Sequence, residues 1–441
     1  MADDADGRVY YVISDLHIGG DEQLGEVDFL EELIAFLERL ETTDEDVELL
    51  INGDAFGLWE ITEIDGLAKF DVLTDRYSGL FEQLRATGAS IPVTMLPGNH
   101  DHDLAAYDEY VDRLAEYNVD LVQAESVTRP VGDRTIHFEH GHQQDPNNRF
   151  EDVGNRHETP LGYYYNALVT SRAGRLSERG RYNWLKDVQA VTPTERVPRW
   201  LLSKYFYREM NPLLRYAVLP FLLLLNVSVV LAVLAGLDVA GVWAMPVEMA
   251  DAVLDQLGYV GETVHLLLVV NAAVAGILLL VGIPVYFVLR DFRQTVDRFG
   301  IFETDLTVDP DEPYKEAARE VFAAQPETAI FCYGHTHRPK VIDVDGRLLV
   351  NTGTWLKRLH RRDVAVGVLP PVFYPSYQLC AVRISAETAG VTVEYEEIEK
   401  SNPSPIEVTR TERLLTLGRE PSSNLPDRSI VSDTASDTGS D

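Results

Sequence analysis

Five short polar motifs in this 441-residue chain contain the residue types that bind divalent metals in proteins. They are Asp15-Leu16-His17, Gly53-Asp54, Gly98-Asn99-His100-Asp101, His140-Gly141-His142 and Gly334-His335-Thr336-His337. Carboxylate, imidazole and amide ligands without thiolates suit manganese, iron, zinc or nickel, and this mixture does not choose among them. The motifs therefore predict a metal site.

The number of ligands indicates two metal ions. The candidate ligands are Asp15, His17, Asp54, Asn99, His140, His335 and His337. Seven ligands are too many for one ion and suit two ions if one carboxylate bridges them. A pair of cations about 3.5 to 4 Å apart can hold a phosphoryl group, polarise it and deprotonate a bound water. We therefore expect two divalent metal cofactors that could act on a phosphoryl group; we take manganese as the first candidate, with iron, zinc or nickel also possible.

The remaining polar side chains of the motifs have other predicted roles. His100 is free to act as the general acid or to stabilise charge in the transition state, with Asp101 available to orient its ring. His142 is our candidate for substrate binding.

The elements that carry these motifs are strands of an α/β fold. An apolar run precedes each of the five motifs, at residues 8–14, 47–52, 91–96, 135–139 and 328–333. Helical patterns at residues 27–40, 80–86, 104–116 and 313–324 alternate with them, and further strands are expected at 119–122, 126–129, 341–344, 348–351, 377–384 and 391–397. This alternation predicts an α/β domain in two parts, residues 1–142 and 312–400.

Residues 143–311 interrupt the pattern. A basic, aromatic stretch at 172–208 is followed by two almost entirely apolar segments at about 216–237 and 264–289. Each segment is long enough to cross roughly 30 Å of hydrocarbon. Because neither segment has a polar face, they predict a two-helix transmembrane hairpin; two buried helices of a soluble domain are the alternative.

The charges beside the two spans predict their orientation. Residues 238–263 contain no Lys or Arg, whereas Arg208 and Arg215 precede the first span and Arg290, Arg293 and Arg298 follow the second. Positive charge favours the cytoplasmic side. We therefore expect a cell-membrane protein with two spans, and with the catalytic domain and both termini in the cytoplasm. The short acidic amino terminus does not resemble a cleaved signal peptide.

The composition restricts the partners and the compartment. The chain has 71 acidic and 38 basic residues, a net charge of -33, which argues against nucleic acid as a partner. An acidic chain poor in Lys suits a halophilic protein in a high-salt cytoplasm; an ordinary acidic protein is the alternative. The two cysteines, Cys332 and Cys380, are too few for a disulfide framework. Residues 401–441, rich in Ser, Thr, Pro and Asp, predict a disordered acidic tail.

Together, the five motifs resemble the sequence blocks of the calcineurin-like metallophosphoesterase family, over about residues 9–139 and 328–384. The resemblance implies a two-sheet αββα sandwich, here with the inserted hairpin. It also implies that Asp15, His17, Asp54 and His337 hold one metal, that Asp54, Asn99, His140 and His335 hold the other, and that His100 assists the leaving group.

Residues 53–59, and the position of the insertion, are similar to those of the UDP-2,3-diacylglucosamine pyrophosphatases, whose helical insertion covers acyl chains. Two residues depart from that group. His100 stands where those enzymes have Arg, and Gly57 stands where they have an acidic residue. The resemblance therefore implies a lipid-linked diphosphate rather than one particular substrate.

The leading hypothesis is a membrane-integral, dimetal-dependent phosphoesterase that hydrolyses a phosphate or diphosphate ester at the cytoplasmic membrane face, with a lipid-linked diphosphate as one substrate class. Anionic membrane lipid would contact residues 172–208 and the cluster Lys357, Arg358, Arg361 and Arg362; simple surface charge and positive-inside topology also explain these clusters. One alternative is a phosphodiesterase or phosphatase for soluble nucleotides whose hairpin is only an anchor. Another is a non-catalytic membrane scaffold.

Overall fold

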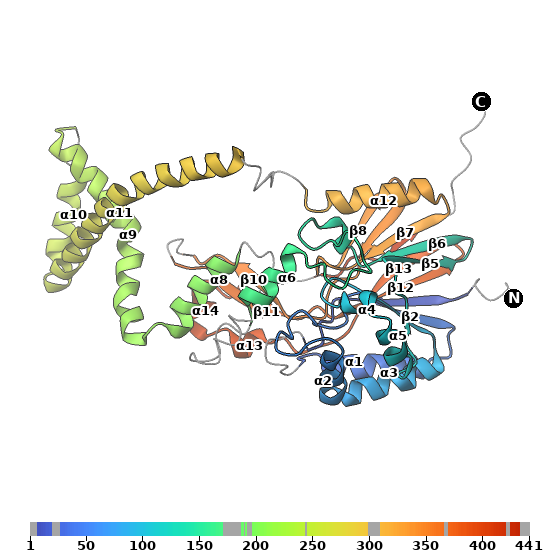
Figure 1. The fold of residues 1–441 in the computed structure, drawn as a ribbon. Helices are drawn as coiled ribbons and strands as arrows, with labels where there is room; N and C mark the ends of the chain where they lie inside the picture. Colours follow the sequence, from blue (N-terminus) through green and yellow to red (C-terminus); the bar gives the residue numbers. More distant parts are fainter. Residues whose placement is uncertain are drawn as a thin grey trace, which may run out of the picture.

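Two β-sheets form the centre of the protein (Figure 1). The computed structural model describes residues 7–19, 27–170, 187–188, 190–191, 196–242, 245–298, 309–365, 369–419 and 424–432. The strands of the first sheet are β1 (Val9–Ile13), β2 (Val47–Asn52), β3 (Val93–Leu96), β4 (Asp120–Leu121), β12 (Cys380–Glu387), β13 (Gly390–Glu397) and β14 (Ser429–Val431). They lie in the order β14-β13-β12-β1-β2-β3-β4, in which β1 to β4 are parallel and β12 to β14 are antiparallel.

The second sheet has five strands. They are β5 (Ser126–Val131), β6 (Arg134–Glu139), β7 (Thr328–Tyr333), β8 (Lys340–Val344) and β9 (Arg347–Asn351). Their order is β5-β6-β7-β9-β8, with β6, β7 and β9 parallel. Strand β7 thus pairs with β6 although about 190 residues of sequence separate them, as the hydrogen bond between Thr135 and Thr328 shows. The insertion interrupts the sequence but not the sheet.

Helices cover the outer faces of the two sheets. Helices α1 (Leu30–Glu41), α2 (Ala68–Arg76), α3 (Ser78–Ser90), α4 (Asp103–Ala106) and α5 (Glu109–Ala115) lie on the side of the first sheet, and α12 (Glu312–Ala324) lies on the second (Figure 1). An apolar core between the sheets joins Leu50 and Val382 to Phe138 and Ile330. The α/β fold is confirmed, and its layers have the order helix, sheet, sheet, helix.

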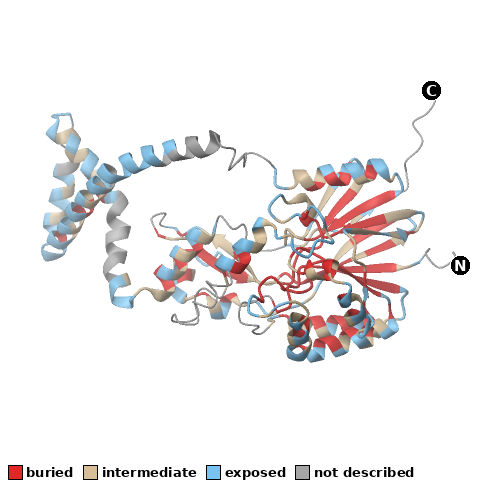
Figure 2. Ribbon diagram, in the orientation of Figure 1, coloured by how far each residue is buried: buried red, intermediate tan, exposed pale blue. Residues whose placement is uncertain are grey.

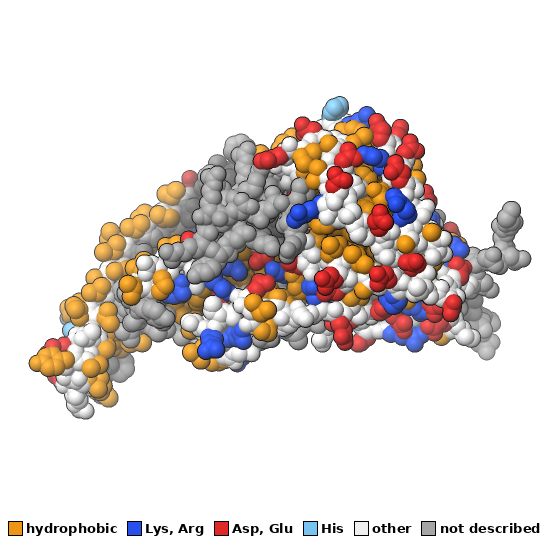
Figure 3. Space-filling view, turned by 90° about the horizontal axis from the view of Figure 1, so that it is seen from below, with side chains coloured by type: hydrophobic (Ala, Val, Ile, Leu, Met, Phe, Trp, Pro, Cys, Tyr) orange, Lys and Arg blue, Asp and Glu red, His pale blue; other side chains and the backbone are white. Residues whose placement is uncertain are grey.

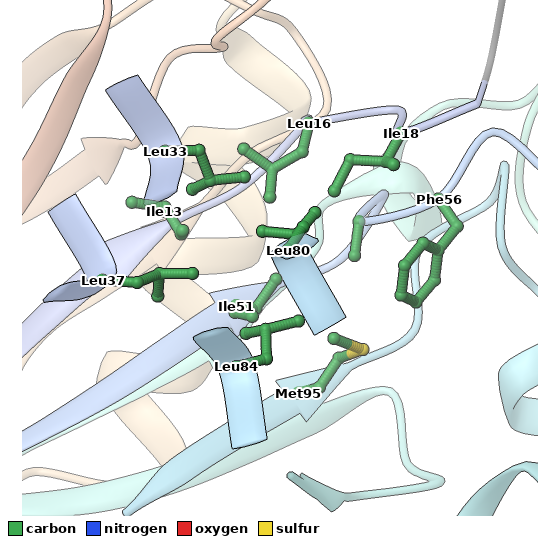
Figure 4. Close-up of a pocket in the computed structure, with 11 residues that line it drawn as sticks. Ile13, Leu16, Ile18, Leu33, Leu37, Ile51, Phe56, Leu80, Leu84 and Met95 are labelled. Carbon is green, nitrogen blue, oxygen red and sulfur yellow. The ribbon is translucent and has the colours of Figure 1, made fainter. Parts of the chain in front are cut away.

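The core beneath the first three motifs is closely packed (Figure 4). Leu16, in the loop after β1, lies over Ile13 and Ile51 of the strands and faces Leu33 of α1 and Leu80 of α3. The space left between these side chains is about 10 Å³, no more than one water would need. Close packing of this kind holds the strand ends, and so the polar loops, in one position.

Replacing Leu37 of α1 by Ala is expected to lower the free energy of unfolding by about 2 to 5 kcal/mol, because the side chain is 1% exposed and its loss leaves a cavity. Urea unfolding followed by tryptophan fluorescence measures this. The matched control is Leu414→Ala, at a side chain 74% exposed, which is expected to change stability by less than about 0.5 kcal/mol. Equal effects of the two changes would contradict this prediction.

A small two-stranded sheet joins the base of the insertion to the carboxyl-terminal part of the chain. Its strands are β10 (Arg358–Arg362) and β11 (Val372–Ser376). Short helical segments of the insertion lie beside it or near the sandwich: η1 (His142–Gln144), α6 (Leu161–Tyr165), η2 (Asn166–Thr170), α8 (Val197–Lys204) and η5 (Tyr205–Glu209). Trp200 of α8 packs on Leu359 and Phe373, and Tyr207 packs with Tyr374.

The prediction of a disordered tail is wrong for residues 401–419 and 424–432. Helices α13 (Ser404–Glu407) and α14 (Arg410–Leu415) follow β13, and Thr409 and Glu412 form a capping box at the start of α14. Val408 packs against β11, and Val431 of β14 lies opposite Val391 of β13. A few apolar side chains are enough to order this segment because they pack on a core that already exists. The average composition of residues 401–441 does not reveal such contacts. Residues 420–423 and 433–441 of the predicted tail lie outside the described residues.

Three helices form an arm that projects away from the sheets (Figure 1). They are α9 (Pro212–Val239), α10 (Met245–Gln256) and α11 (Tyr259–Arg298). We call α9, α10 and α11 the helical arm. Most of its described side chains are exposed (Figure 2), and hydrophobic side chains gather on it, whereas charged ones are spread over the sandwich (Figure 3).

Among the described residues, one helical segment of the arm, Tyr259–Val288, is long and apolar enough to cross a membrane. Only 6% of its most apolar 18-residue stretch is buried, unlike the core helix of a soluble protein. The predicted span 264–289 falls largely within it. Of the other predicted span, the side chains of residues 216–226 lie outside the described ones, and Val227–Val239 is a shorter apolar helix. The structure also places α10 where the sequence predicts only a loop between the spans.

Candidate active site

The five polar motifs follow β1, β2, β3, β6 and β7, at the carboxyl ends of parallel strands. Eight non-glycine residues have a left-handed φ in the described part of the chain, and five of them are predicted ligands: Asp15, His17, Asp54, His335 and His337. L-residues rarely adopt this conformation, which costs free energy and concentrates at functional sites. The backbone of these loops is therefore strained, and the strained conformation directs the five side chains toward one another.

One group of candidate ligands comes from the first and last motifs. His337 Nε2 lies 3.1 Å from Asp15 Oδ1 and 3.3 Å from His17 Nε2. His17 Nε2 is in turn 3.6 Å from Asp54 Oδ2. The ligand atoms of Asp15, His17 and His337 all lie within 4.8 Å of one another, so they could hold one metal ion.

A second group shares Asp54 with the first. His140 Nε2 lies 3.1 Å from Asp54 Oδ2, and His335 Nδ1 lies 3.0 Å from Asn99 Oδ1. The ligand atoms of Asp54, His140 and His335 again lie within 4.8 Å of one another. The structure thus brings together all seven predicted ligands, with Asp54 between the two groups.

The donor atoms between the two groups fit a cation. Asp54 Oδ2 and His140 Nε2 are buried and face each other at 3.1 Å. His140 Nδ1 lies 2.9 Å from the Asn52 carbonyl, an acceptor, so Nδ1 carries a proton and Nε2 is the nitrogen left for a metal. Burial alone would lower the pKa of His140, but the Asp54 carboxylate raises it to about 10, so without a cation Nε2 is protonated and donates to Asp54. A divalent cation would replace that proton and bind both atoms.

Close backbone contacts hold the shared carboxylate in place. The His100 backbone N–H donates to Asp54 Oδ1 at 2.8 Å. At Gly98, a Cβ atom would lie 2.2 Å from the same oxygen, so only glycine allows the loop after β3 to approach Asp54 this closely. The glycine of this motif is thus required by the position of the carboxylate.

The His100 ring lies beside the two groups and is held by Glu60. His100 Nδ1 is 2.7 Å from Glu60 Oε1, and the same oxygen accepts a hydrogen bond of 2.7 Å from Asn166 Nδ2 of the insertion. The other faces of the ring contact Trp59 and His17, at centroid separations of 4.7 and 4.5 Å. Burial alone would lower the pKa of His100, but the Glu60 and Asp54 carboxylates outweigh it and raise that pKa to about 9. The ring is therefore a proton donor at neutral pH.

The prediction that Asp101 orients the His100 ring is wrong. The Asp101 carboxylate accepts hydrogen bonds from the backbone N–H groups of Gly98, Asp54 and Phe56, at 2.6, 3.3 and 3.1 Å. It therefore fixes the loops after β2 and β3 against each other, and Glu60 has the role assigned to it. The sequence places Asp101 next to His100, but neighbouring side chains point in different directions.

His335 has a partner that sequence reasoning missed. Its Nε2 lies 3.1 Å from Asp145 Oδ2, while its Nδ1 faces Asn99. Asp145 also accepts a hydrogen bond of 2.7 Å from Asn148 Nδ2. Burial raises the pKa of Asp145, but the hydrogen bond with His335 lowers it to about 2, so the carboxylate is ionised. A carboxylate on the far nitrogen of a ligand histidine orients the ring and raises its basicity.

His142 lies near the second group without belonging to it. Its ring centroid is 5.5 Å from that of His140 and 6.5 Å from that of His335. Its Nδ1 is buried and has no hydrogen-bond partner in the described structure. Substrate binding by His142 stays a prediction.

The comparison with protein families decides which family this chain belongs to. The family model described as calcineurin-like phosphoesterase matches residues 9–232, which is half of the chain. The chain is a member of this family. The match covers four of the five motifs. The motif at Gly334 lies beyond residue 232, but it follows β7, and the pairing of β7 with β6 places it beside the motif at His140. This calcineurin-like phosphoesterase is a metal-dependent phosphoric ester hydrolase, since the family acts on phosphate esters and the side chains here include candidate metal-binding groups.

Several solved structures are similar to this phosphoesterase at low identity. One is a conserved uncharacterised protein, a predicted phosphoesterase, from Streptococcus pneumoniae (10% identity, TM-score 0.28, covering 89% of this chain and 90% of that chain). Another is a single mutant of Vps29 from Entamoeba histolytica (11% identity, TM-score 0.26, covering 89% of this chain and 94% of that chain). A third is phosphopantetheinyl hydrolase from Mycobacterium tuberculosis (12% identity, TM-score 0.26, covering 79% of this chain and 91% of that chain). A search of curated proteins finds no match. The family assignment therefore rests on the family match alone.

Proposed function

We propose that this phosphoesterase is a membrane-bound, dimetal-dependent enzyme that hydrolyses a phosphate or diphosphate ester, with lipid-linked diphosphates as its first substrate class. The observation that carries the dimetal part is the shared carboxylate: Asp54 Oδ2 lies between His17 Nε2, at 3.6 Å, and His140 Nε2, at 3.1 Å. One oxygen that faces a ligand of each group is the arrangement that a bridged metal pair needs.

In this proposal Asp15, His17, Asp54 and His337 hold one divalent cation, and Asp54, Asn99, His140 and His335 hold the other. When bound, such a pair polarises the phosphoryl group and lowers the pKa of a bound water. Manganese is the first candidate, with iron, zinc or nickel as alternatives.

His100 would supply the proton of the reaction. Glu60 holds Nδ1, so Nε2 remains free to meet the oxygen of the leaving group. A water that has given up one proton to the solvent forms a bond to phosphorus through its oxygen, the bond from phosphorus to the leaving oxygen breaks, and the Nε2 proton of His100 passes to the leaving oxygen.

The membrane part of the proposal is supported by the helical arm. Its segment Tyr259–Val288 exposes apolar side chains that a bilayer would cover, and Arg290 follows it. We place the arm in the cell membrane with two spans and the catalytic domain in the cytoplasm. The insertion would then keep the active site near lipid headgroups, since Asn166 of the insertion contacts both Glu60 and His100.

The test is hydrolysis by the detergent-purified protein with added manganese. Release of phosphate or of a nucleoside monophosphate from lipid-linked diphosphates is expected, with a soluble nucleotide diester and bis-p-nitrophenyl phosphate run in parallel. Turnover of the soluble esters alone would overturn the lipid part and favour an enzyme for soluble nucleotides. Absence of turnover of every ester, with metal bound, would overturn the enzymatic proposal.

Asp145→Asn is expected to weaken the binding of one metal ion about 10- to 100-fold while the other binds as before, because only His335 loses its carboxylate partner. Isothermal titration of the metal-free protein with manganese resolves the two steps. The matched control is Asp133→Asn in the exposed turn between β5 and β6, which should bind both ions as the wild type does. Unchanged binding of both ions by Asp145→Asn would contradict this role.

A further inference from the structure

An arginine-lined cavity lies where the insertion, β10 and the loop after the last motif meet. We call it the arginine cavity; its volume is about 190 Å³, far more than one water needs. Its lining residues are Ala190, Arg196, Arg338, Arg358, Leu359 and His360. Three of the six are arginines and none is acidic, in a chain that has 71 acidic and 38 basic residues.

Two of these arginines lack an acidic partner. In the described part of the chain no carboxylate lies within 4.0 Å of Arg338 or Arg358, and the one side-chain hydrogen bond of Arg358 goes to the neutral Gln378, at 3.1 Å. The basic neighbours on the strand differ. Lys357 is 3.1 Å from both Asp187 and Glu407, and Arg361 is 2.6 Å from Asp363. Arg358, which lines the cavity, therefore differs from Lys357 and Arg361, whose charges are paired with carboxylates.

The positive charges act on one another across this cavity. Burial lowers the pKa of Arg358, and the nearby Arg338 lowers it further. His360, hydrogen-bonded to Ser376 Oγ at 2.7 Å, has its pKa lowered to about 4 by burial and by Arg358, Arg362 and Arg196. Holding the Arg338 and Arg358 guanidinium groups together without a carboxylate partner is costly, and an anion with several oxygens would satisfy their fixed donors.

One residue that lines the cavity is the sequence neighbour of a candidate metal ligand. Arg338 directly follows His337, and consecutive Cα atoms are about 3.8 Å apart. This adjacency is the reason to ask whether a substrate at the metal ligands also contacts the cavity.

We propose that the arginine cavity binds a phosphate group, namely the phosphate of the substrate that is not hydrolysed, and so selects diphosphate esters over esters with one phosphate. This inference rests on the proposed function. Free inorganic phosphate offers the same chemistry, and the two arms of the experiment below separate the two sources.

The first arm measures binding without catalysis. Metal-free full-length protein is titrated calorimetrically with pyrophosphate and with inorganic phosphate. Arg358→Gln and Arg338→Gln are each expected to weaken pyrophosphate binding about tenfold or more, through the loss of a charge-assisted contact. Arg361→Gln, on the same strand but paired with Asp363, is the matched control and should bind as the wild type does. Absence of pyrophosphate binding by the wild type, or an equal loss in the control, would overturn the proposal.

The second arm measures selectivity. With manganese present, Arg338→Gln and Arg358→Gln should raise the KM for a nucleoside diphosphate sugar about tenfold and leave kcat/KM for bis-p-nitrophenyl phosphate unchanged. If the variants lose phosphate binding but hydrolyse both esters normally, the cavity binds free phosphate and its assignment to the substrate is wrong. If the wild type hydrolyses neither ester, the proposed function fails, while the binding arm still decides whether the cavity is an anion site. Arg338 lies in an exposed loop, so Arg338→Gln is expected to fold and can be measured even if Arg358→Gln, in strand β10, does not fold.

Discussion

Asp54→Asn is expected to reduce kcat/KM by about 10³-fold or more, equivalent to about 4 kcal/mol of transition-state stabilisation. The physical reason is the position of its carboxylate, which faces His17 and His140 from between the two groups of candidate ligands. An amide of the same shape carries no charge and cannot bridge two cations. The metal content of the purified protein, measured by inductively coupled plasma mass spectrometry, should fall together with the activity.

The same carboxylate also accepts the backbone N–H of His100, so the change could disturb the loop itself. Urea unfolding of the metal-free variant separates the two effects, since a loss of metal with unchanged stability points to the ligand role. Asp75→Asn, at an exposed side chain of α2, is the matched control and should keep full activity and metal. An Asp54→Asn protein that keeps both ions and its activity would show that the site does not work as proposed.

The clustering of the candidate metal ligands could be predicted from sequence because strand ends restrict where side chains lie. Asp15 and Asp54 follow neighbouring parallel strands, and His335 and His337 follow a third strand in the other sheet, so their types and places already imply one cluster. The structure adds the left-handed backbone that turns these residues toward one another. Glycines such as Gly98 are the visible sign of that close approach in the sequence.

The residues that support the site could not be predicted in the same way. Glu60 and Asp145 are two of 71 acidic residues, and neither stands in a motif or directly after a strand. Asn166 lies in the insertion, which the sequence separates from the catalytic domain, yet it contacts Glu60 and His100. What identifies all three is a contact in space between segments far apart in the chain. The tail was misjudged for a related reason, since Val408 and Val431 matter only where a strand is present to receive them.

The Glu60 and His100 pair leads to the other large expected effect. His100→Asn should lower kcat by about 10² to 10⁴-fold for an ester with a poor, alkoxide-like leaving group, because the general acid is lost. For a p-nitrophenyl ester the loss should be much smaller, since that leaving group departs without a proton. Metal content should not change, because the predicted ligand of this motif is Asn99. The ligand atoms of His17, Asp54 and His100 also lie within 4.8 Å of one another, so a loss of metal in the variant would show that His100 is a ligand and not the proton donor. The matched control is His157→Asn, at an exposed histidine outside the site.

Glu60→Gln tests whether the carboxylate acts through His100. Among the described residues, His100 is the one candidate catalytic group within hydrogen-bond distance of the Glu60 carboxylate, which lies 2.7 Å from His100 Nδ1. The amide keeps the shape but removes the charge that favours the protonated ring, so the variant should show the same dependence on leaving group as His100→Asn, at a smaller size. In the double variant the two losses should not add, because Glu60 has no effect once the ring is gone. Additive losses, or an equal effect on good and poor leaving groups, would show that Glu60 only supports the local structure and that His100 is not the proton donor.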